Sequence, residues 1–192
     1  MRLLTASAVS EVLAPTPVTL AMTAIVALSS SPSLAIGLLW TTLAGLFAGL
    51  IPYAVVILGV RRGDLSGRHI PDRGQRLVPM ALAGVSLVVG IVLLVLLGAP
   101  RNLVALLLSQ VAGVAVGLAV TARWKASIHT AGVAGAVTVL VILFGWTAAV
   151  AAPAVPLVAW SRVQLGAHSW SQVVAGAALG VVVGGGVFAL TR

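Results

Sequence analysis

Apolar runs of about 18 residues or more recur along this chain, and they constrain its fold more than any other feature. Each run is long enough to cross a hydrocarbon layer of about 30 Å as a helix. Hydrophobic residues make up 60% of the 192-residue chain and charged residues only 7%, far from the averages of soluble domains. The sequence therefore predicts an all-helical, polytopic membrane protein that forms a single transmembrane domain, residues 1–192.

The apolar sequence divides into seven segments, which predicts six to seven membrane segments in a helix bundle. Residues 3–14 are expected to form a short interfacial helix with Glu11 facing water, and Pro52 is expected to kink the second crossing. The N-terminus lacks the pattern of a cleaved secretory signal and is expected to be retained. The sixth segment is shorter than a full crossing needs. The segments in order are residues 16–29, 34–60, 78–98, 103–121, 130–150, 153–162 and 171–190.

Three polar segments interrupt the apolar sequence: residues 61–76, 123–129 and 160–172. All histidines of the chain lie in these segments. Two crossings separate the first segment from the second, and two more separate the second from the third. Because an even number of crossings returns the chain to the same face, the three polar segments are predicted to meet on one side of the membrane. The histidines are His69, His129 and His168.

Most basic residues are expected on that same side, with Arg101 and Arg192 opposite. The positive-inside rule then places the polar segments at the cytoplasmic face of the cell membrane. For any single arginine, a solvated flanking position is the alternative interpretation. A nucleic-acid partner is not expected, because the chain offers no extended soluble surface and its basic residues lack an interleaved aromatic platform. The basic residues on this side are Arg2, Arg61, Arg62, Arg68, Arg73, Arg76, Arg123, Lys125 and Arg162.

The third polar segment carries the strongest indication of a functional site. An arginine and a histidine within apolar sequence are costly unless they face a polar cavity, a partner or the interface, so Arg162 and His168 mark a candidate site. Gly166 is expected to end one helix, and Ser169 with Gln172 three residues later predicts a capping box that starts the next. His168 would then lie at a helix N-terminus, where the helix dipole favours an anion.

These residues resemble the type 2 phosphatidic acid phosphatase superfamily of integral membrane lipid phosphatases, over roughly residues 60–190. Its third motif is serine-arginine, five residues, histidine, three residues and aspartate. Here Ser161-Arg162, His168 and Gln172 have that spacing, with glutamine in place of the aspartate.

The other two motifs of the family match in part. The second is proline-serine-glycine-histidine, and this chain shares Ser127 and His129 with it. The first is lysine, six residues and arginine-proline; His69 and Arg76 have the spacing, but Leu77 follows where proline is expected. The resemblance implies the four-helix core of these histidine phosphatases within residues 61–192, preceded by N-terminal helices in residues 1–60.

The resemblance also implies roles for these residues. His168 would attack phosphorus to form a phosphohistidine, and His129 would protonate the leaving oxygen. Arg76, Arg162 and Ser127 would hold the phosphoryl oxygens, and the mechanism needs no metal or other cofactor. The less certain phosphate contacts are His69, Arg68, Arg73 and Lys125.

Glutamine at position 172 is the most important departure from the family. Residues 168 and 172 are four apart on a helix, so the amide oxygen can accept the hydrogen bond from His168 but supplies no negative charge. In a serine protease triad, an amide in place of the orienting carboxylate costs about 10⁴ in rate. Asp64 or Asp72 of the first polar segment is a possible substitute.

Each of these residues also has a structural interpretation. Gln172 and Ser127 can act only as capping residues, and Arg162 can be a helix end that extends its side chain to the interface. A metal site from the three histidines with Asp64 or Asp72 is a further alternative, although their spacing matches no known ligand pattern. Glycines four residues apart, such as Gly176, Gly180 and Gly184, predict close helix packing or a homodimer face; the set also includes Gly45, Gly49, Gly113 and Gly117.

The sequence therefore predicts a membrane enzyme that hydrolyses a phosphate monoester or diphosphate on a phospholipid or polyprenyl carrier. Two alternatives stay open. The first is a phosphotransferase of the same fold, which passes the phosphoryl group to another lipid or sugar. The second is a catalytically silent protein that binds or moves an anionic lipid.

Overall fold

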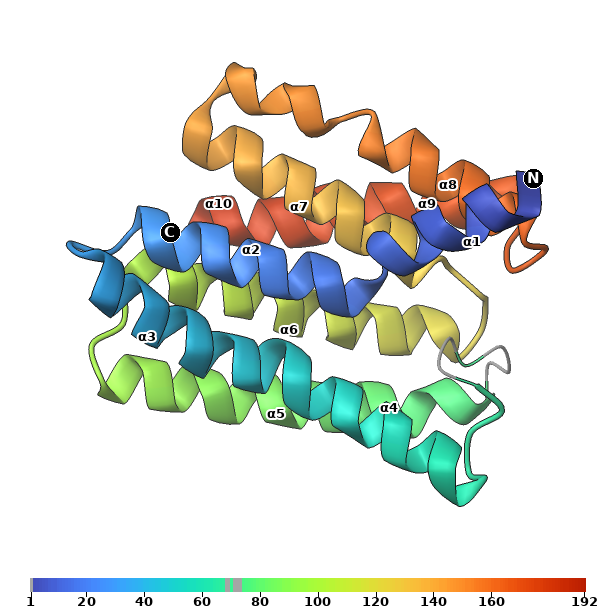
Figure 1. Cartoon of the computed structure of the whole chain (residues 1–192), viewed down its shortest axis with the longest axis horizontal. Helices are drawn as coiled ribbons and strands as arrows, with labels where there is room; N and C mark the ends of the chain where they lie inside the picture. The colour runs from blue at the N-terminus through green and yellow to red at the C-terminus, as the bar shows by residue number, and fades with distance from the viewer. Residues whose placement is uncertain (1, 68–69, 71–73) are drawn as a thin grey trace.

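The computed structural model describes residues 2–67, 70 and 74–192, and every regular element within them is helical, as predicted. The helices run alongside one another as a bundle, with the connecting turns at its two ends (Figure 1). The α-helices are α1 (Arg2–Val12), α2 (Pro15–Ser29), α3 (Leu34–Gly45), α4 (Ile51–Arg62), α5 (Leu77–Leu96), α6 (Arg101–Thr121), α7 (Ile128–Phe144), α8 (Ala154–Gln164), α9 (Trp170–Leu179) and α10 (Gly186–Thr191). Two π-helical segments, η1 (Leu46–Leu50) and η4 (Gly180–Gly185), and two 3-10 segments, η2 (Gly74–Arg76) and η3 (Trp146–Ala151), join some of them.

Four helical stretches within the described residues are long and apolar enough to cross a bilayer. The predicted number of six to seven is larger, because it counted shorter segments as well. α1 and α2 pass the same test only as a pair, with a bend of 43° between them, and α7 is apolar but has 17 residues. The four stretches are Leu34–Arg62, Gly74–Leu96, Arg101–Thr121 and Trp170–Thr191.

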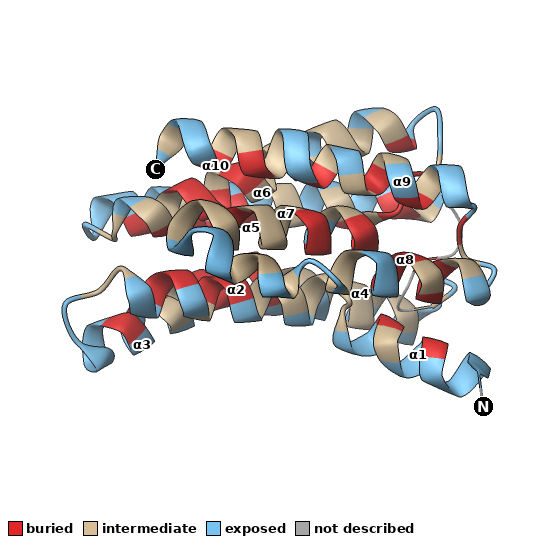
Figure 2. Ribbon diagram, turned by 90° about the horizontal axis from the view of Figure 1, so that it is seen from above, coloured by how far each residue is buried: buried red, intermediate tan, exposed pale blue. Residues whose placement is uncertain are grey.

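The outer surface of the bundle is apolar, which is compatible with a membrane protein. Large side chains such as Val85, Leu96 and Val182 are exposed on it, whereas Leu103, Leu107 and other buried residues follow the inner sides of the helices (Figure 2). A soluble monomer rarely exposes so much contiguous apolar surface. In lipid this surface costs little, and close packing between helices stabilises the bundle instead.

A π-helical turn precedes Pro52, where the sequence predicts a kink. The N–H of Ile51 donates to the Leu46 carbonyl, five residues back. In the same register the Phe47 carbonyl would need a donor at position 52, but proline has no N–H. The hydroxyl of Ser86 on α5 donates to that carbonyl at 2.7 Å instead. One helix thus satisfies the backbone group that proline leaves open in its neighbour.

The fifth apolar segment ends earlier than predicted. α7 stops at Phe144 because Gly145 adopts φ 76° and ψ −170°, a conformation that favours glycine. The chain then turns and returns beside α7 through η3 and α8 (Figure 1). These two elements together span about 30 Å, so the returning segment is longer than the predicted residues 153–162.

Glycines let the C-terminal helix approach α7 closely, as predicted. A Cβ atom at Gly176 would collide with the carbonyl oxygen of Ser127, and one at Gly180 with that of Ala131. A Cβ atom at Gly184 would lie at an ordinary contact distance from the Cα atom of Gly135. This close approach fixes α9 against the start of α7, where the second and third polar segments meet.

Candidate functional site

The described parts of the three polar segments lie together at one end of the bundle. The C-terminus of α4, the start of α5, the α6–α7 linker and the α8–α9 turn all lie at the end that carries the N-terminus (Figure 1). At the other end, Arg101 Nε donates to the Thr191 carbonyl at 3.1 Å, and Arg192 Nη1 to the Ile142 carbonyl at 2.9 Å. Among the basic residues that the structure describes, the predicted separation between the two ends is therefore present.

His168 lies in the turn between α8 and α9, between two helix ends that are both capped by hydrogen bonds. Gly166 has φ 64°, and the backbone N–H of His168 donates to the Arg162 carbonyl at 3.3 Å. Ser169 then caps α9, and Gln172 completes the predicted capping box. The position of His168 is thus fixed by the backbone on both sides.

The ring orientation of His168 is set by Gln172. The Nδ1 atom of His168 lies 3.1 Å from Gln172 Oε1, which also accepts the backbone N–H of Ser169 at 3.2 Å. Since a backbone N–H only donates, the amide atom at this position is the oxygen, and Nδ1 must carry the proton that reaches it. The lone pair of the neutral ring is therefore on Nε2. The hydrogen bond expected from the four-residue spacing is confirmed, and so is the capping role.

The start of α7 is tied to the same turn. Ser127 is fully buried and caps α7; its hydroxyl oxygen accepts hydrogen bonds from the backbone N–H and the hydroxyl of Thr130. Its own backbone N–H donates to the Gln172 carbonyl at 3.1 Å. His129 follows in the first turn of α7 and is buried. The second and third motifs thus form one connected structure.

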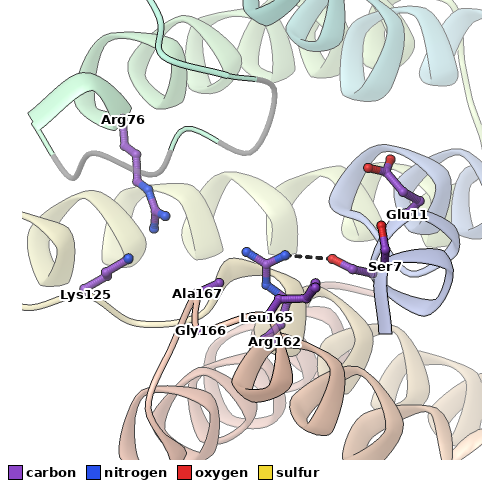
Figure 3. Close-up of a pocket in the computed structure, with 9 residues that line it drawn as sticks. Ser7, Glu11, Arg76, Lys125, Arg162, Leu165, Gly166 and Ala167 are labelled. Carbon is purple, nitrogen blue, oxygen red and sulfur yellow. Dashed lines mark hydrogen bonds between the residues drawn. The ribbon is translucent and has the colours of Figure 1, made fainter. Parts of the chain in front are cut away.

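A cavity of about 350 Å³ lies beside this turn, and cationic side chains line it. Arg76 comes from η2, Lys125 from the α6–α7 linker and Arg162 from α8 (Figure 3). Gly166 and Ala167, directly before His168, also line it. Neither His168 nor His129 is among its described lining residues. Because three of the lining side chains are positive, the cavity favours an anion.

The surroundings of His168 favour its neutral form. Burial lowers its pKa to about 4, and the charges of Arg162, Lys125 and Arg76 act in the same direction, against the hydrogen bond to Gln172. Burial and the charges of Arg76 and Arg162 also lower the pKa of Lys125. At neutral pH the imidazole is therefore uncharged, and its lone pair is on Nε2.

Arg76 is buried despite its charge, with 5% of its surface exposed. Its Nε donates to the Ile70 carbonyl at 2.7 Å, which fixes the guanidinium at the cavity. Arg76, the arginine that matches the first motif, lines the cavity. Arg68, His69, Asp72 and Arg73 lie outside the described residues.

Asp64 does not reach this cavity. It lines a different groove between α4 and α5, together with Arg62. Substitution of Asp64 for the missing carboxylate at position 172 stays a prediction. The described residues contain no group of three or more histidine, aspartate or glutamate side chains that could hold a metal ion.

Helix α1 supplies a wall of the cavity that the sequence did not predict. Ser7, Ser10 and Glu11 line it, although α1 was expected to be an interfacial helix. Glu11 is exposed, as expected, but faces this cavity. Contacts between residues about 150 positions apart leave no local pattern in the sequence. The available signal was the spacing of Ala6 and Ser10, two small residues one turn apart in an apolar segment.

No protein-family model, no curated protein and no solved structure matches this chain.

Proposed function

We propose that this protein is an integral membrane lipid phosphatase that hydrolyses a phosphate monoester or diphosphate of a phospholipid or polyprenyl carrier. The observation that carries the proposal is the oriented, neutral His168 beside a cavity with three cationic side chains. A nucleophile fixed in one tautomer and an adjacent anion site are the two requirements of phosphoryl transfer through histidine.

In the proposed first step, the Nε2 lone pair of His168 attacks phosphorus. An N–P bond forms, the bond from phosphorus to the ester or anhydride oxygen breaks, and His129 gives a proton to the leaving oxygen. Arg76 and Arg162, with Lys125, stabilise the charge on the other phosphoryl oxygens, and the Ser127 hydroxyl retains its proton for a further acceptor.

Water then attacks phosphorus, with His129 accepting its proton, and the N–P bond breaks. Inorganic phosphate leaves and both imidazoles return to their starting states. The partial positive charge on His168 during the first step is met by the amide oxygen of Gln172 rather than by a carboxylate. The first step is therefore slower than it would be with a carboxylate at this position.

A lipid substrate is supported by the location of the cavity. It lies at the end of an apolar bundle, next to helices whose outer surfaces are suited to hydrocarbon. The excess of basic residues at this end supports a cytoplasmic orientation in the cell membrane, with six to seven membrane segments when α7 and the η3–α8 unit are included.

A second candidate function is binding or transport of an anionic lipid without chemistry. The observation in its favour is Gln172, which is neutral and whose oxygen is shared between His168 and the backbone of Ser169. A protein that only binds needs the cations but not a carboxylate behind the imidazole.

Phosphate release from a lipid panel distinguishes the two candidates. Purified protein in detergent is incubated with phosphatidic acid, phosphatidylglycerol phosphate and polyprenyl phosphates, with and without chelator, beside His168→Ala. Chelator-resistant release that disappears in the variant supports the phosphatase. Tight binding of one lipid without release from any supports the second candidate. Release that persists in His168→Ala overturns the proposed mechanism, and dependence on an added lipid or sugar acceptor indicates a phosphotransferase.

A further inference from the structure

Helix α1 is attached to the candidate site by two consecutive residues of the third motif. The hydroxyl of Ser161 donates to the Ala6 carbonyl at 2.7 Å, and Arg162 Nη1 donates to the Ser10 hydroxyl at 2.7 Å. Ala6 and Ser10 lie one turn apart on the same face of α1, and both are buried. The serine-arginine pair therefore holds α1 against α8.

The hydrogen bond from Arg162 to Ser10 determines which edge of the guanidinium faces the cavity. A guanidinium has five N–H groups in one plane, and its Nε and Nη2 donors form an edge that can bind an oxyanion at two points. Ser10 occupies Nη1, which lies outside that edge. Nε of Arg162 is buried and has no hydrogen-bond partner among the described residues.

An unpartnered, buried guanidinium N–H at the wall of a cationic cavity indicates a missing acceptor. Arg162 is 5% exposed, and Figure 3 shows its guanidinium between α1 and the side chains of Arg76 and Lys125. A phosphoryl oxygen in the cavity would satisfy this donor, and a second oxygen of the same group could reach Nη2.

We propose that Ser10 is a positioning residue for phosphate binding: it holds the Arg162 guanidinium so that its Nε–Nη2 edge binds the phosphoryl group. This inference rests on the proposed function for the identity of the anion. α1 is then part of the binding site rather than a membrane-surface helix beside it. Because the bond is charge-assisted and buried, its loss weakens phosphate binding by about tenfold to a hundredfold.

The test measures binding of inorganic phosphate to the purified full-length protein by calorimetry, together with kcat and KM on the best lipid of the panel. Ser10→Ala is expected to raise the phosphate Kd by about tenfold or more, and Ser10→Thr, which restores a hydroxyl, is expected to recover most of it. The matched control is Ser109→Ala, which removes an equally buried hydroxyl from α6, where it donates to the Leu106 carbonyl. Its phosphate Kd should equal that of the wild type.

A double-mutant cycle separates positioning from simple loss of structure. If Ser10 acts through the guanidinium, Ser10→Ala should add little to the defect of Arg162→Lys, which lacks the two-point edge. Fully additive losses, or an unchanged phosphate Kd in Ser10→Ala, would overturn the inference. If the wild type itself binds no phosphate and releases none, the proposed function fails instead, so the two failures are distinguishable.

Discussion

At the scale of single residues, Gln172 performs two tasks that a carboxylate would also perform, and lacks a third. Its oxygen completes the cap of α9 and fixes the tautomer of His168. In the proposed attack on phosphorus, it would not offset the positive charge that develops on the imidazole. The pKa of His168, lowered to about 4, reflects the same missing negative charge. Burial and nearby cations oppose protonation of the ring, and only the hydrogen bond to the uncharged amide of Gln172 favours it.

We predict that Gln172→Asp maintains or raises turnover, because the added charge stabilises the imidazolium-like transition state. Gln172→Glu is the length-matched control, since it preserves the reach to both Nδ1 of His168 and the N–H of Ser169. The measurement is kcat on the best lipid substrate. A strong loss in both variants would show that this site uses a different arrangement.

The lowered pKa of His168 also predicts a pH dependence. Its value in the fold is below the usual 6.5, so the unfolded chain binds more protons between pH 6.5 and 4, and stability falls as the pH decreases through that window. Thermal unfolding in detergent should therefore show a larger decrease in Tm from pH 7 to 4 for the wild type than for His168→Gln. Equal decreases would show that His168 is not held neutral.

The protonation of His168 should also be visible in catalysis. The acid limb of kcat/KM reports the free enzyme, so the limb due to His168 should lie near pH 4 rather than near 6.5. Gln172→Glu should move it to higher pH, because a carboxylate favours the charged ring.

Residue spacing predicted the contacts within one turn of helix but not those between distant segments. The four-residue spacing of His168 and Gln172 and the caps at Ser127 and Ser169 followed from helix geometry. Ser10 was missed because its partner is 152 residues away, and the spacing of Ala6 and Ser10 alone does not identify the residues that cover this face of an 11-residue helix.

At the scale of helices, the contact between α7 and the α9–η4 stretch determines the geometry of the site. Gly176 and Gly180 lie directly against the backbone of α7, and the Gln172 carbonyl accepts the N–H of Ser127 at the same crossing. A side chain between these helices would separate the two motifs. We therefore expect these glycines to matter to the geometry of the site as well as to packing.

Gly180→Ala tests this coupling. Its methyl group would meet the Ala131 carbonyl, so we expect a loss of about 1–3 kcal/mol in stability and reduced activity, because α9 must move away from α7. Gly132→Ala is the matched control: it lies on α7 but faces open space, and the change should be neutral or slightly stabilising. Thermal unfolding and phosphate release are measured for both. Wild-type behaviour of Gly180→Ala would contradict this role.

The sequence predicted helices better than it predicted where they end or bend. Apolarity indicated the fifth segment up to residue 150, but it is insensitive to backbone conformation, and the positive φ of Gly145 ends α7 at Phe144. The disturbance at Pro52 was predicted, whereas its π-helical form depends on the hydroxyl that Ser86 supplies from another helix.

At the scale of the whole molecule, the fold separates polar from apolar sequence along one axis. The described parts of the polar segments and the cavity lie at one end (Figure 1), and many large apolar side chains are exposed on the helices between the ends. Counting membrane crossings predicted this arrangement, because whether their number is odd or even does not depend on the exact helix boundaries. The cavity itself was not predictable in this way, since four separate parts of the chain form it.

The absence of cysteine makes the orientation directly testable. Ser66→Cys places a single thiol at the polar end, and Ser33→Cys places one in the α2–α3 turn at the other end; both positions are exposed. With a membrane-impermeant maleimide on intact cells, Ser33→Cys should be labelled and Ser66→Cys only after permeabilisation. The opposite result would place the cavity on the outer face.

The central claim is that His168 carries the phosphoryl group, and direct detection of the covalent intermediate tests it best. Wild-type protein is mixed with lipid phosphate, quenched in base to preserve the N–P bond, and digested for mass spectrometry. The account predicts a phosphoryl group on the peptide that contains His168, absent from His168→Ala and increased by His129→Ala when the leaving group needs no proton. Turnover of the lipid with no phosphorylated His168, or with the phosphoryl group on another residue, would contradict it.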